Sequence, residues 1–347
     1  MKQIPNDLTI GPFTLDRAAD LGLSARVLEG DRFRRPWPGV RTLREVPESL
    51  VDRCRAAALV LPESAAFSHD TALHLGGWLT PNVGDGPARY STREPNASVP
   101  IHVTVPRLHV RPQGRGVVGH RSDLSPDDIL DMNGLRVTSP WRTWCDLADG
   151  ASEVDLVILA DALRKRFGNG AYRLETHLGT WSGRRGLRSL RRALSRSRDG
   201  VDSPMETRLR LIFEDAGLPE PVVNRWVTRD HGDPIHCPDL SWPAWRVAAD
   251  YDGGHHADWD SENDVRGRRA SDWRQRQDIS RRDLLEEVGW ILRVFTSFDV
   301  FRAPERTVER MRLALRMPGP TSEEPSGGYP TESRLRTVGL PPLGAHP

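Results

Sequence analysis

Hydrophobic residues at the start of the chain recur in short runs that favour two brief helices followed by a hairpin. Within residues 1–48, Thr14 and Ser24 each stand where they can cap such a helix, and the segment 31–43 has basic residues before a Pro-Gly turn. Helix, tight turn, helix and basic hairpin is the order of a winged helix-turn-helix, in which the second helix enters the DNA major groove. The pattern predicts such a module, with a purely structural helix pair as the alternative.

Residues 49–181 are predicted to form a mixed α/β region. Helical spacing of apolar residues predicts helices over 50–61, 152–166 and 172–180, and alternation predicts a strand over 99–105. The histidines of this region show no metal-ligand spacing on one predicted face, so we interpret them as core or surface residues. They are His69, His74, His102, His109 and His120.

Residues 182–199 are predicted to form a basic helix that links this region to the last domain. Leu187, Leu190 and Leu194 form one apolar stripe, and the run 182–198 holds seven arginines and no acid. Such a helix either grips phosphates or is a solvated linker, and we expect it to hold DNA together with the N-terminal hairpin. The candidate DNA-binding residues are Arg184, Arg185, Arg188, Arg191, Arg192, Arg32, Arg34 and Arg35.

The pattern from residue 200 to 316 predicts an α-β-β-β-α-β core and a final helix. Its elements are a helix from Ser203 to Gly217, strands over 222–228, 235–242 and 245–252, a helix over 272–288, a strand over 290–295 and a helix over 304–316. The Pro-, Gly- and Ser-rich segment 317–347 cannot bury a core and is expected to be a disordered tail. These patterns together predict an α/β multidomain protein.

Composition indicates the cellular compartment in which the protein is expected, and it argues against membrane-spanning and disulfide-rich classes of protein. The chain has 49 basic and 48 acidic side chains, and no stretch approaches the roughly 20 apolar residues that cross a bilayer. Its first residues lack an apolar signal segment. Cys54, Cys145 and Cys237 are too far apart to suggest a disulfide framework or a cysteine-rich zinc site. We expect a cytoplasmic protein with no membrane partner.

Four acidic residues fall where the predicted elements would bring them together. Asp239 lies on the second strand of the last domain, and Asp250 and Asp252 face one side of the third because strand side chains alternate. Glu206 lies on the preceding helix, and pairing across the turn at Pro243 would place Asp239 beside Asp250. Converging carboxylates repel one another unless a cation lies among them, and oxygen-only ligands select Mg²⁺ or Mn²⁺.

This arrangement resembles the PD-(D/E)XK restriction-endonuclease-like superfamily, and more closely its very-short-patch-repair endonuclease branch. The layout with residues 1–200 in front also resembles proteins that place such a domain behind an AbiEi-type antitoxin winged helix. The residues that carry the nuclease resemblance are Glu206, Pro238-Asp239, Asp250-Tyr251-Asp252-Gly253, His255-His256, Arg281-Arg282-Asp283, Gly289-Trp290 and Arg293.

The resemblance implies metal-dependent hydrolysis of DNA phosphodiester bonds, in repair or phage defence. Asp239 and Asp250 would hold Mg²⁺ or Mn²⁺, and Glu206 would complete the shell through water. The lysine of the wider superfamily is replaced here by Asp252, and the chain has no lysine after Lys165. The repair-endonuclease branch uses a nearby histidine, so the resemblance implies that His255 or His256 is the general base, unless Asp252 itself orients the water.

Purely structural roles remain an alternative for the same residues. Ser203 and Glu206 have the spacing of a capping box, in which Glu206 would accept the Ser203 backbone N–H. Asp239 and Asp252 could be turn residues. A DNA-binding antitoxin or transcriptional regulator with an inactive nuclease-like domain is the rival function, and a protein-interaction module is the third. The expected partner is DNA, with a cognate toxin or another defence-system protein in the antitoxin case.

Overall fold

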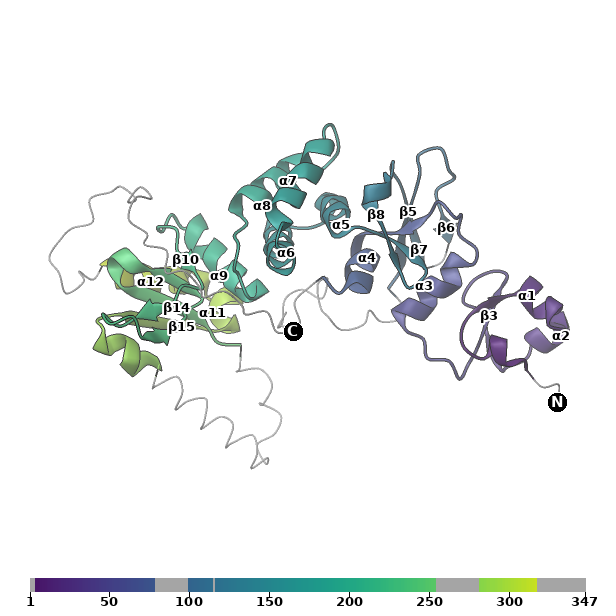
Figure 1. Cartoon of the computed structure of the whole chain (residues 1–347), viewed down its shortest axis with the longest axis horizontal. Helices are drawn as coiled ribbons and strands as arrows, with labels where there is room; N and C mark the ends of the chain where they lie inside the picture. The colour runs from purple at the N-terminus through teal and green to yellow at the C-terminus, as the bar shows by residue number, and fades with distance from the viewer. Residues whose placement is uncertain (1–3, 79–98, 115, 254–280, 317–347) are drawn as a thin grey trace, which may run out of the picture.

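The computed structural model describes residues 4–78, 99–114, 116–253 and 281–316 (Figure 1). These residues form a mixed α/β protein with several sheets, as the sequence predicts at that level. In the described ranges, no helix combines the length and the apolar character needed to cross a membrane. The predicted tail 317–347, His255 and His256 lie outside the described residues.

The N-terminal module is a small three-stranded antiparallel sheet with two helices. The Thr14 hydroxyl accepts the Arg17 backbone N–H at 3.1 Å, which is the predicted cap of the first helix. The second helix is a single turn, and Ser24 precedes it without a side-chain capping bond. The sheet order is β1-β3-β2, and the elements are β1 (Phe13–Thr14), α1 (Leu15–Asp20), α2 (Ala25–Leu28), β2 (Phe33–Arg34) and β3 (Val40–Leu43).

The middle region is built on a six-stranded sheet of order β6-β7-β5-β4-β9-β8. The strand predicted over 99–105 corresponds to β5, whereas the hairpin of β8 and β9 was not predicted, although Asn133 and Gly134 supply the two positive φ angles of its tight turn. The elements are α3 (Leu50–Ala58), β4 (Ala66–Phe67), α4 (His69–Gly76), β5 (Ile101–Val105), β6 (Gln113–Gly114), β7 (Val117–Arg121), β8 (Ile129–Met132), β9 (Leu135–Thr138) and α5 (Pro140–Asp146).

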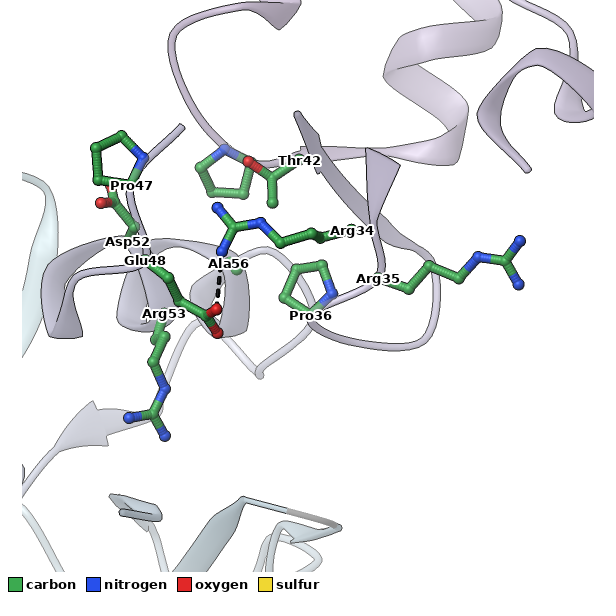
Figure 2. Close-up of a pocket in the computed structure, with 10 residues that line it drawn as sticks. Arg34, Arg35, Pro36, Thr42, Pro47, Glu48, Asp52, Arg53 and Ala56 are labelled. Atoms are coloured by element: carbon green, nitrogen blue, oxygen red, sulfur yellow. Dashed lines mark hydrogen bonds and ion pairs between the residues drawn. The ribbon is translucent and has the colours of Figure 1, made fainter. Parts of the chain in front are cut away.

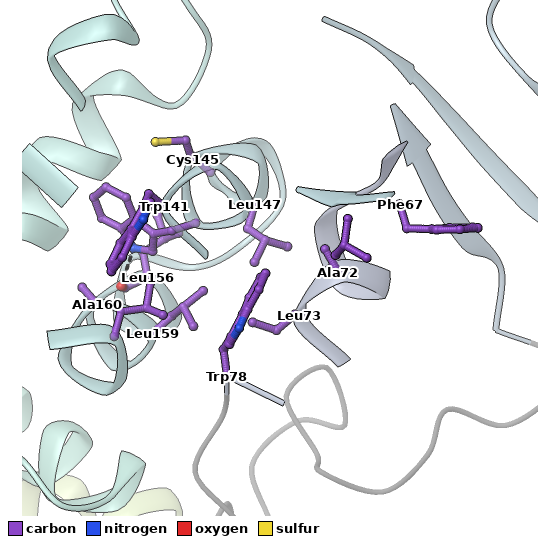
Figure 3. Close-up of a cluster of buried hydrophobic side chains, with 14 of the residues drawn as sticks. Phe67, Ala72, Leu73, Trp78, Trp141, Cys145, Leu147, Leu156, Leu159 and Ala160 are labelled. Atoms are coloured by element: carbon purple, nitrogen blue, oxygen red, sulfur yellow. Dashed lines mark hydrogen bonds between the residues drawn. The ribbon is translucent and has the colours of Figure 1, made fainter. Parts of the chain in front are cut away.

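Three further helices complete this region and share its hydrophobic core. They are α6 (Glu153–Arg166), α7 (Gly170–Thr180) and α8 (Leu187–Arg196). Figure 3 shows part of that core, in which Trp141 and Trp78 lie among aliphatic side chains of several helices. The predicted basic helix is α8, and it is shorter than expected because Gly186 precedes it with a φ of 75°. It is not a solvated linker, since Leu190 and Ala193 are fully buried in the same core.

The C-terminal region carries a four-stranded sheet of order β10-β13-β14-β15, in which β15 runs parallel to β14 and the other neighbours are antiparallel. Its elements are α9 (Pro204–Asp215), β10 (Val222–Val223), β11 (Val227–Thr228), β12 (Pro234–His236), β13 (Leu240–Trp242), β14 (Val247–Tyr251), β15 (Ile291–Phe295), α11 (Ser297–Phe301) and α12 (Pro304–Arg316). Residues 281–287 are helical, and the rest of the predicted helix that starts at 272 lies mainly outside the described residues.

Two predicted strands of this region were wrong in extent. The segment 222–228 is not one strand, because Asn224 adopts a φ of 43° and divides it into β10 and β11, which belong to different sheets. The segment 235–242 is likewise divided into β12 and β13. The divisions place β11 and β12 in a separate two-stranded sheet and leave residues 237–239 outside any strand, immediately before β13.

Helix α9 ties the middle and C-terminal regions together. Leu211 is buried in the core of the middle region, whereas Met205, Leu209 and Phe213 are buried in the core around the C-terminal sheet. The adjacent Arg210 guanidinium donates to Asp161 of α6 at 2.8 Å. The predicted domain boundary at residue 200 therefore precedes a helix that packs against the cores of both the middle and the C-terminal regions.

Candidate carboxylate site

The register of β13 and β14 places Asp239 next to Asp250. Leu240 pairs with Ala249, so Asp239 and Asp250 face each other one step further along the antiparallel strands. The Asp239 backbone N–H donates to Oδ1 of Asp250 at 3.2 Å, and the Tyr251 backbone N–H donates to Oδ2 of Asp239 at 2.6 Å. The prediction that the turn at Pro243 brings these two acids together is confirmed by this geometry.

Glu206 reaches the same corner from the first turn of α9. Its side chain is buried, and Oε2 accepts the Asp202 backbone N–H at 2.9 Å and the Asn224 side-chain amide at 3.0 Å. Ser203 Oγ accepts the Glu206 backbone N–H at 3.2 Å, which is half of the capping box considered from the sequence. The other half is different, because the Glu206 carboxylate binds the N–H of Asp202.

Asn224 connects the two sides of the site and was not singled out from the sequence. Its side-chain amide donates to Glu206, and its backbone N–H donates to the carbonyl oxygen of Asp239 at 3.0 Å. The positive φ of Asn224 allows both contacts, since it turns the chain out of β10 at this point. No spacing rule would have found a bridging role that depends on one backbone angle.

The site brings several negatively charged carboxylates close together. Burial, together with the negative charges of Glu206 and Asp250, raises the pKa of Asp239 to about 8. Burial also raises the pKa of Glu206, against the opposing effect of its bond to the Asp202 backbone. A cation placed among these groups would relieve both the repulsion and the cost of burial, and it would keep the carboxyls ionised near neutral pH.

His236 is a further member of the site and was not singled out from the sequence. It is the last residue of the short strand β12, and its Nε2 lies 2.7 Å from Oδ2 of Asp250 on β14. Asp252 follows the end of β14, where its backbone N–H donates to the carbonyl oxygen of Phe295 at 2.7 Å. The structure therefore gives Asp250 a histidine partner within the described residues.

The carboxylates are not as tightly gathered as a preformed ligand set. Within the described ranges, three metal-binding side chains with ligand atoms all within 4.8 Å of one another occur at His69, His102 and His120. Glu206, Asp239 and Asp250 do not meet that spacing. The interpretation of those three histidines as scattered residues was wrong, because the parallel pairing of β5 with β7 brings His102 and His120 together.

The arginines predicted to bind DNA on the basic segment divide into two groups. Arg188 and Arg191 on α8 are exposed and have no ion pair among the described residues. The other three are engaged: Arg184 lies over the Trp181 ring at 4.4 Å, Arg185 is 3.8 Å from Asp149, and Arg192 is 3.0 Å from Glu153. Arg188 and Arg191 are therefore the better candidates for phosphate contacts.

The N-terminal arginines divide in the same way. Figure 2 shows a pocket of about 130 Å³ in which Arg34 reaches Glu48, with an Nη1 to Oε2 distance of 2.8 Å. Arg34 also donates to the Val46 carbonyl oxygen, and Arg35 donates to that of Glu29 at 3.3 Å. Arg32 is exposed and has no side-chain partner in the described part of the chain. Arg34 is consequently a structural residue of the hairpin.

Comparison with known proteins gives a distant likeness. No family model matches the chain, and no solved structure matches it significantly. Two uncharacterized proteins from two strains of Mycobacterium tuberculosis, MT2308 and Rv2248, are each 26% identical to it over 241 residues, which is 70% of this chain and 83% of each relative. Neither name states an activity.

Proposed function

We propose that the C-terminal region is a restriction-endonuclease-like domain that hydrolyses DNA phosphodiester bonds with Mg²⁺ or Mn²⁺. The observation that carries the proposal is the contact of Asp239, which immediately precedes β13, with Asp250 on the neighbouring strand β14, together with the buried Glu206. The order of elements supports it, because one helix, an antiparallel set of strands, a helix and a parallel strand follow one another as the resemblance implies.

The donor set fits a hard divalent cation. All three side chains offer carboxylate oxygens, and the raised pKa of Asp239 shows how unfavourable their charges are together. Asp239 and Asp250 would hold the ion directly, and Glu206, which is already anchored by Asp202 and Asn224, would reach it through water. The ion would supply Lewis-acid stabilisation of the charge that develops on the scissile phosphate.

The proton transfer is assigned to a histidine in place of the missing lysine. His255 or His256 would accept a proton from the attacking water, since a neutral imidazole is a suitable base near neutral pH. Both residues lie outside the described residues, and Asp252 is the competing candidate for orienting the water. His236 would keep Asp250 in place through its 2.7 Å contact. Arg188 and Arg191 would contact DNA phosphates.

A DNA-binding regulator with an inactive nuclease-like domain is the second candidate, and one observation favours it. The two aspartates are held by backbone N–H groups, and the three carboxylates do not form a compact ligand group. Such a corner can be stable without a cation. In this candidate the winged-helix-like module would bind DNA, although α2, as a single turn, presents a short recognition helix.

The deciding experiment is incubation of the pure full-length protein with supercoiled plasmid and Mg²⁺ or Mn²⁺. Nicked or linear plasmid that is absent with EDTA and with Asp239→Asn, but present with Asp230→Asn, supports the nuclease. Asp230 is the matched control because it is an exposed acid on the neighbouring hairpin. DNA binding without cleavage under all conditions would favour the regulator, and failure to bind any DNA would favour a protein-interaction module.

A further inference from the structure

Three histidines from two strands and one helix meet at one point of the middle region. His102 on β5 pairs with Val118 of β7, and His120 pairs with Thr104, so the two histidines lie diagonally on one face of the parallel strands. Nδ1 of His102 is 3.0 Å from Nε2 of His120. His69, the first residue of α4, stacks on the His120 ring with a centroid distance of 3.7 Å.

The backbone of His69 is held in an unusual conformation. It has a φ of 52°, which a residue with a side chain rarely adopts and which costs free energy unless the surroundings fix it. Its Nδ1 lies 2.9 Å from Ser68 Oγ, which in turn accepts the Thr104 hydroxyl at 2.7 Å. This chain of contacts holds the imidazole against the other two and leaves Nε2 of His69 outside that chain.

The three imidazoles are kept neutral. Burial, reinforced by the neighbouring histidines, lowers the pKa of His69 to about 2 and that of His120 to about 4. Burial also lowers the pKa of His102, against the opposing charge of Asp70. A neutral imidazole has a lone pair on one ring nitrogen, which is the form that binds a metal ion.

We propose that His69, His102 and His120 bind one Zn²⁺ ion, at a site separate from the carboxylates. One ligand atom from each residue lies within 4.8 Å of the others. Two nitrogens at about 2.0–2.1 Å from a tetrahedral Zn²⁺ ion are about 3.3 Å apart, close to the separation of the two strand histidines. Because His69 and His120 are stacked, binding turns at least one of these rings so that the lone pairs converge.

The surroundings have the features of a zinc site with an open position. Asp70 Oδ2 lies 3.9 Å from Nε2 of His102, where it can orient the ring once Nδ1 is a ligand. A pocket of about 140 Å³, lined by His69 and His120, reaches the cluster from outside. Three protein nitrogens with a fourth position open to water are the arrangement of reactive rather than structural zinc sites. Imidazole ligands favour Zn²⁺ over Mg²⁺, so the two sites differ in selectivity.

The proposal is tested by titrating metal-free full-length protein with Zn²⁺ against a coloured chelator. We expect one Zn²⁺ per chain, at least a tenfold loss of affinity in His102→Gln and in His120→Gln, and no displacement by excess Mg²⁺. His74→Gln, on the same helix as His69, and Asp239→Asn, in the carboxylate site, are the controls and should bind as wild type does. Circular dichroism checks that each variant is folded.

Cobalt gives a second measurement that needs no variant. Co²⁺ bound to wild type should show the intense visible absorption of a tetrahedral ion with nitrogen ligands, and Zn²⁺ should remove it. Absence of Zn²⁺ binding by wild type, a cobalt spectrum like that of the hydrated ion, or unchanged affinity in folded His102→Gln would each overturn the proposal. Plasmid cleavage is not part of either measurement, so the result is independent of the nuclease proposal.

Discussion

Asp239 and Asp250 hold each other in place through one carboxylate and one backbone N–H: Oδ1 of Asp250 accepts the Asp239 N–H at 3.2 Å. The Asp239 carboxylate is fixed in turn by the N–H of Tyr251 at 2.6 Å. These two contacts fix both side chains at the ends of the strands. Fixed ligand side chains are one requirement of a metal site on a sheet, although Glu206, Asp239 and Asp250 do not form a compact ligand group.

The first prediction concerns pH and stability. Because the pKa of Asp239 is raised to about 8, the folded state binds its proton more tightly than the unfolded state does. Its stabilising effect is complete below about pH 4 and is lost as the pH rises toward 8. Asp239→Asn should therefore exceed wild type in unfolding free energy at pH 8, without metal, by on the order of 1–3 kcal/mol.

Urea unfolding in EDTA at pH 5 and pH 8 measures this difference. Asp230→Asn, which removes an exposed carboxylate from the neighbouring hairpin, should follow the wild-type pH dependence. If the difference in unfolding free energy between wild type and Asp239→Asn were the same at both pH values, the Asp239 carboxyl would not have a raised pKa in the folded protein.

The second prediction is that Asp239 and Asp250 bind Mn²⁺. Isothermal calorimetry should show at least a tenfold weaker affinity in Asp239→Asn and in Asp250→Asn, because each removes a charged oxygen ligand. Glu206→Gln should have a smaller effect if Glu206 acts through water. Equal Mn²⁺ affinity in wild type and both aspartate variants would end the metal hypothesis for this corner.

The third prediction assigns DNA affinity to the free face of α8. Arg188 and Arg191 are exposed and unpaired among the described residues, so replacing both with Gln should reduce the slope of log K against log salt by about 2 on duplex DNA. Arg136→Gln with Arg306→Gln removes two other exposed charges and serves as the control. Fluorescence anisotropy at several salt concentrations measures the slopes, and an unchanged slope would move the contact surface elsewhere.

The fourth prediction concerns the base. If a histidine replaces the missing lysine, cleavage should rise between about pH 5.5 and 7.5. His255→Ala combined with His256→Ala should abolish it while DNA binding is retained. Asp252→Asn separates the competing account, since it should be inactive only if Asp252 orients the water. Wild-type cleavage by the double histidine variant would reject the histidine mechanism and leave the nuclease proposal standing.

The fifth prediction concerns the junction between α6 and α9. Asp161 and Arg210 form a 2.8 Å ion pair with side chains that are 2% and 0% exposed. Asp161→Ala should cost about 3–5 kcal/mol in unfolding free energy, because the Arg210 charge would stay buried with less compensation. Arg229→Ala breaks the exposed pair with Glu287 and should cost less than about 1 kcal/mol. Similar losses in the two variants would contradict this account.

Local signals in the sequence were enough for most of the helices, although α11 was not predicted, and for one part of the site. Ser139 and Ser203 accept backbone N–H groups three residues later, and the interactions that start these helices involve neighbours along the chain. The approach of Asp239 to Asp250 was predictable for the same reason, since a short connection at Pro243 limits how the two strands can pair. These features depend on separations of a few residues.

Only the tertiary structure decided the contacts between distant segments. His69, His102 and His120 meet because β5 and β7 are parallel neighbours and α4 begins beside them, which no spacing along the chain expresses. The bridge by Asn224 depends on one positive φ angle. Folding brought the Trp181 ring to Arg184 and acidic side chains to Arg185 and Arg192, which distinguishes these arginines from the exposed Arg188 and Arg191. Local sequence determines the elements, because caps and turns act between near neighbours, whereas long-range packing determines which side chains share a site.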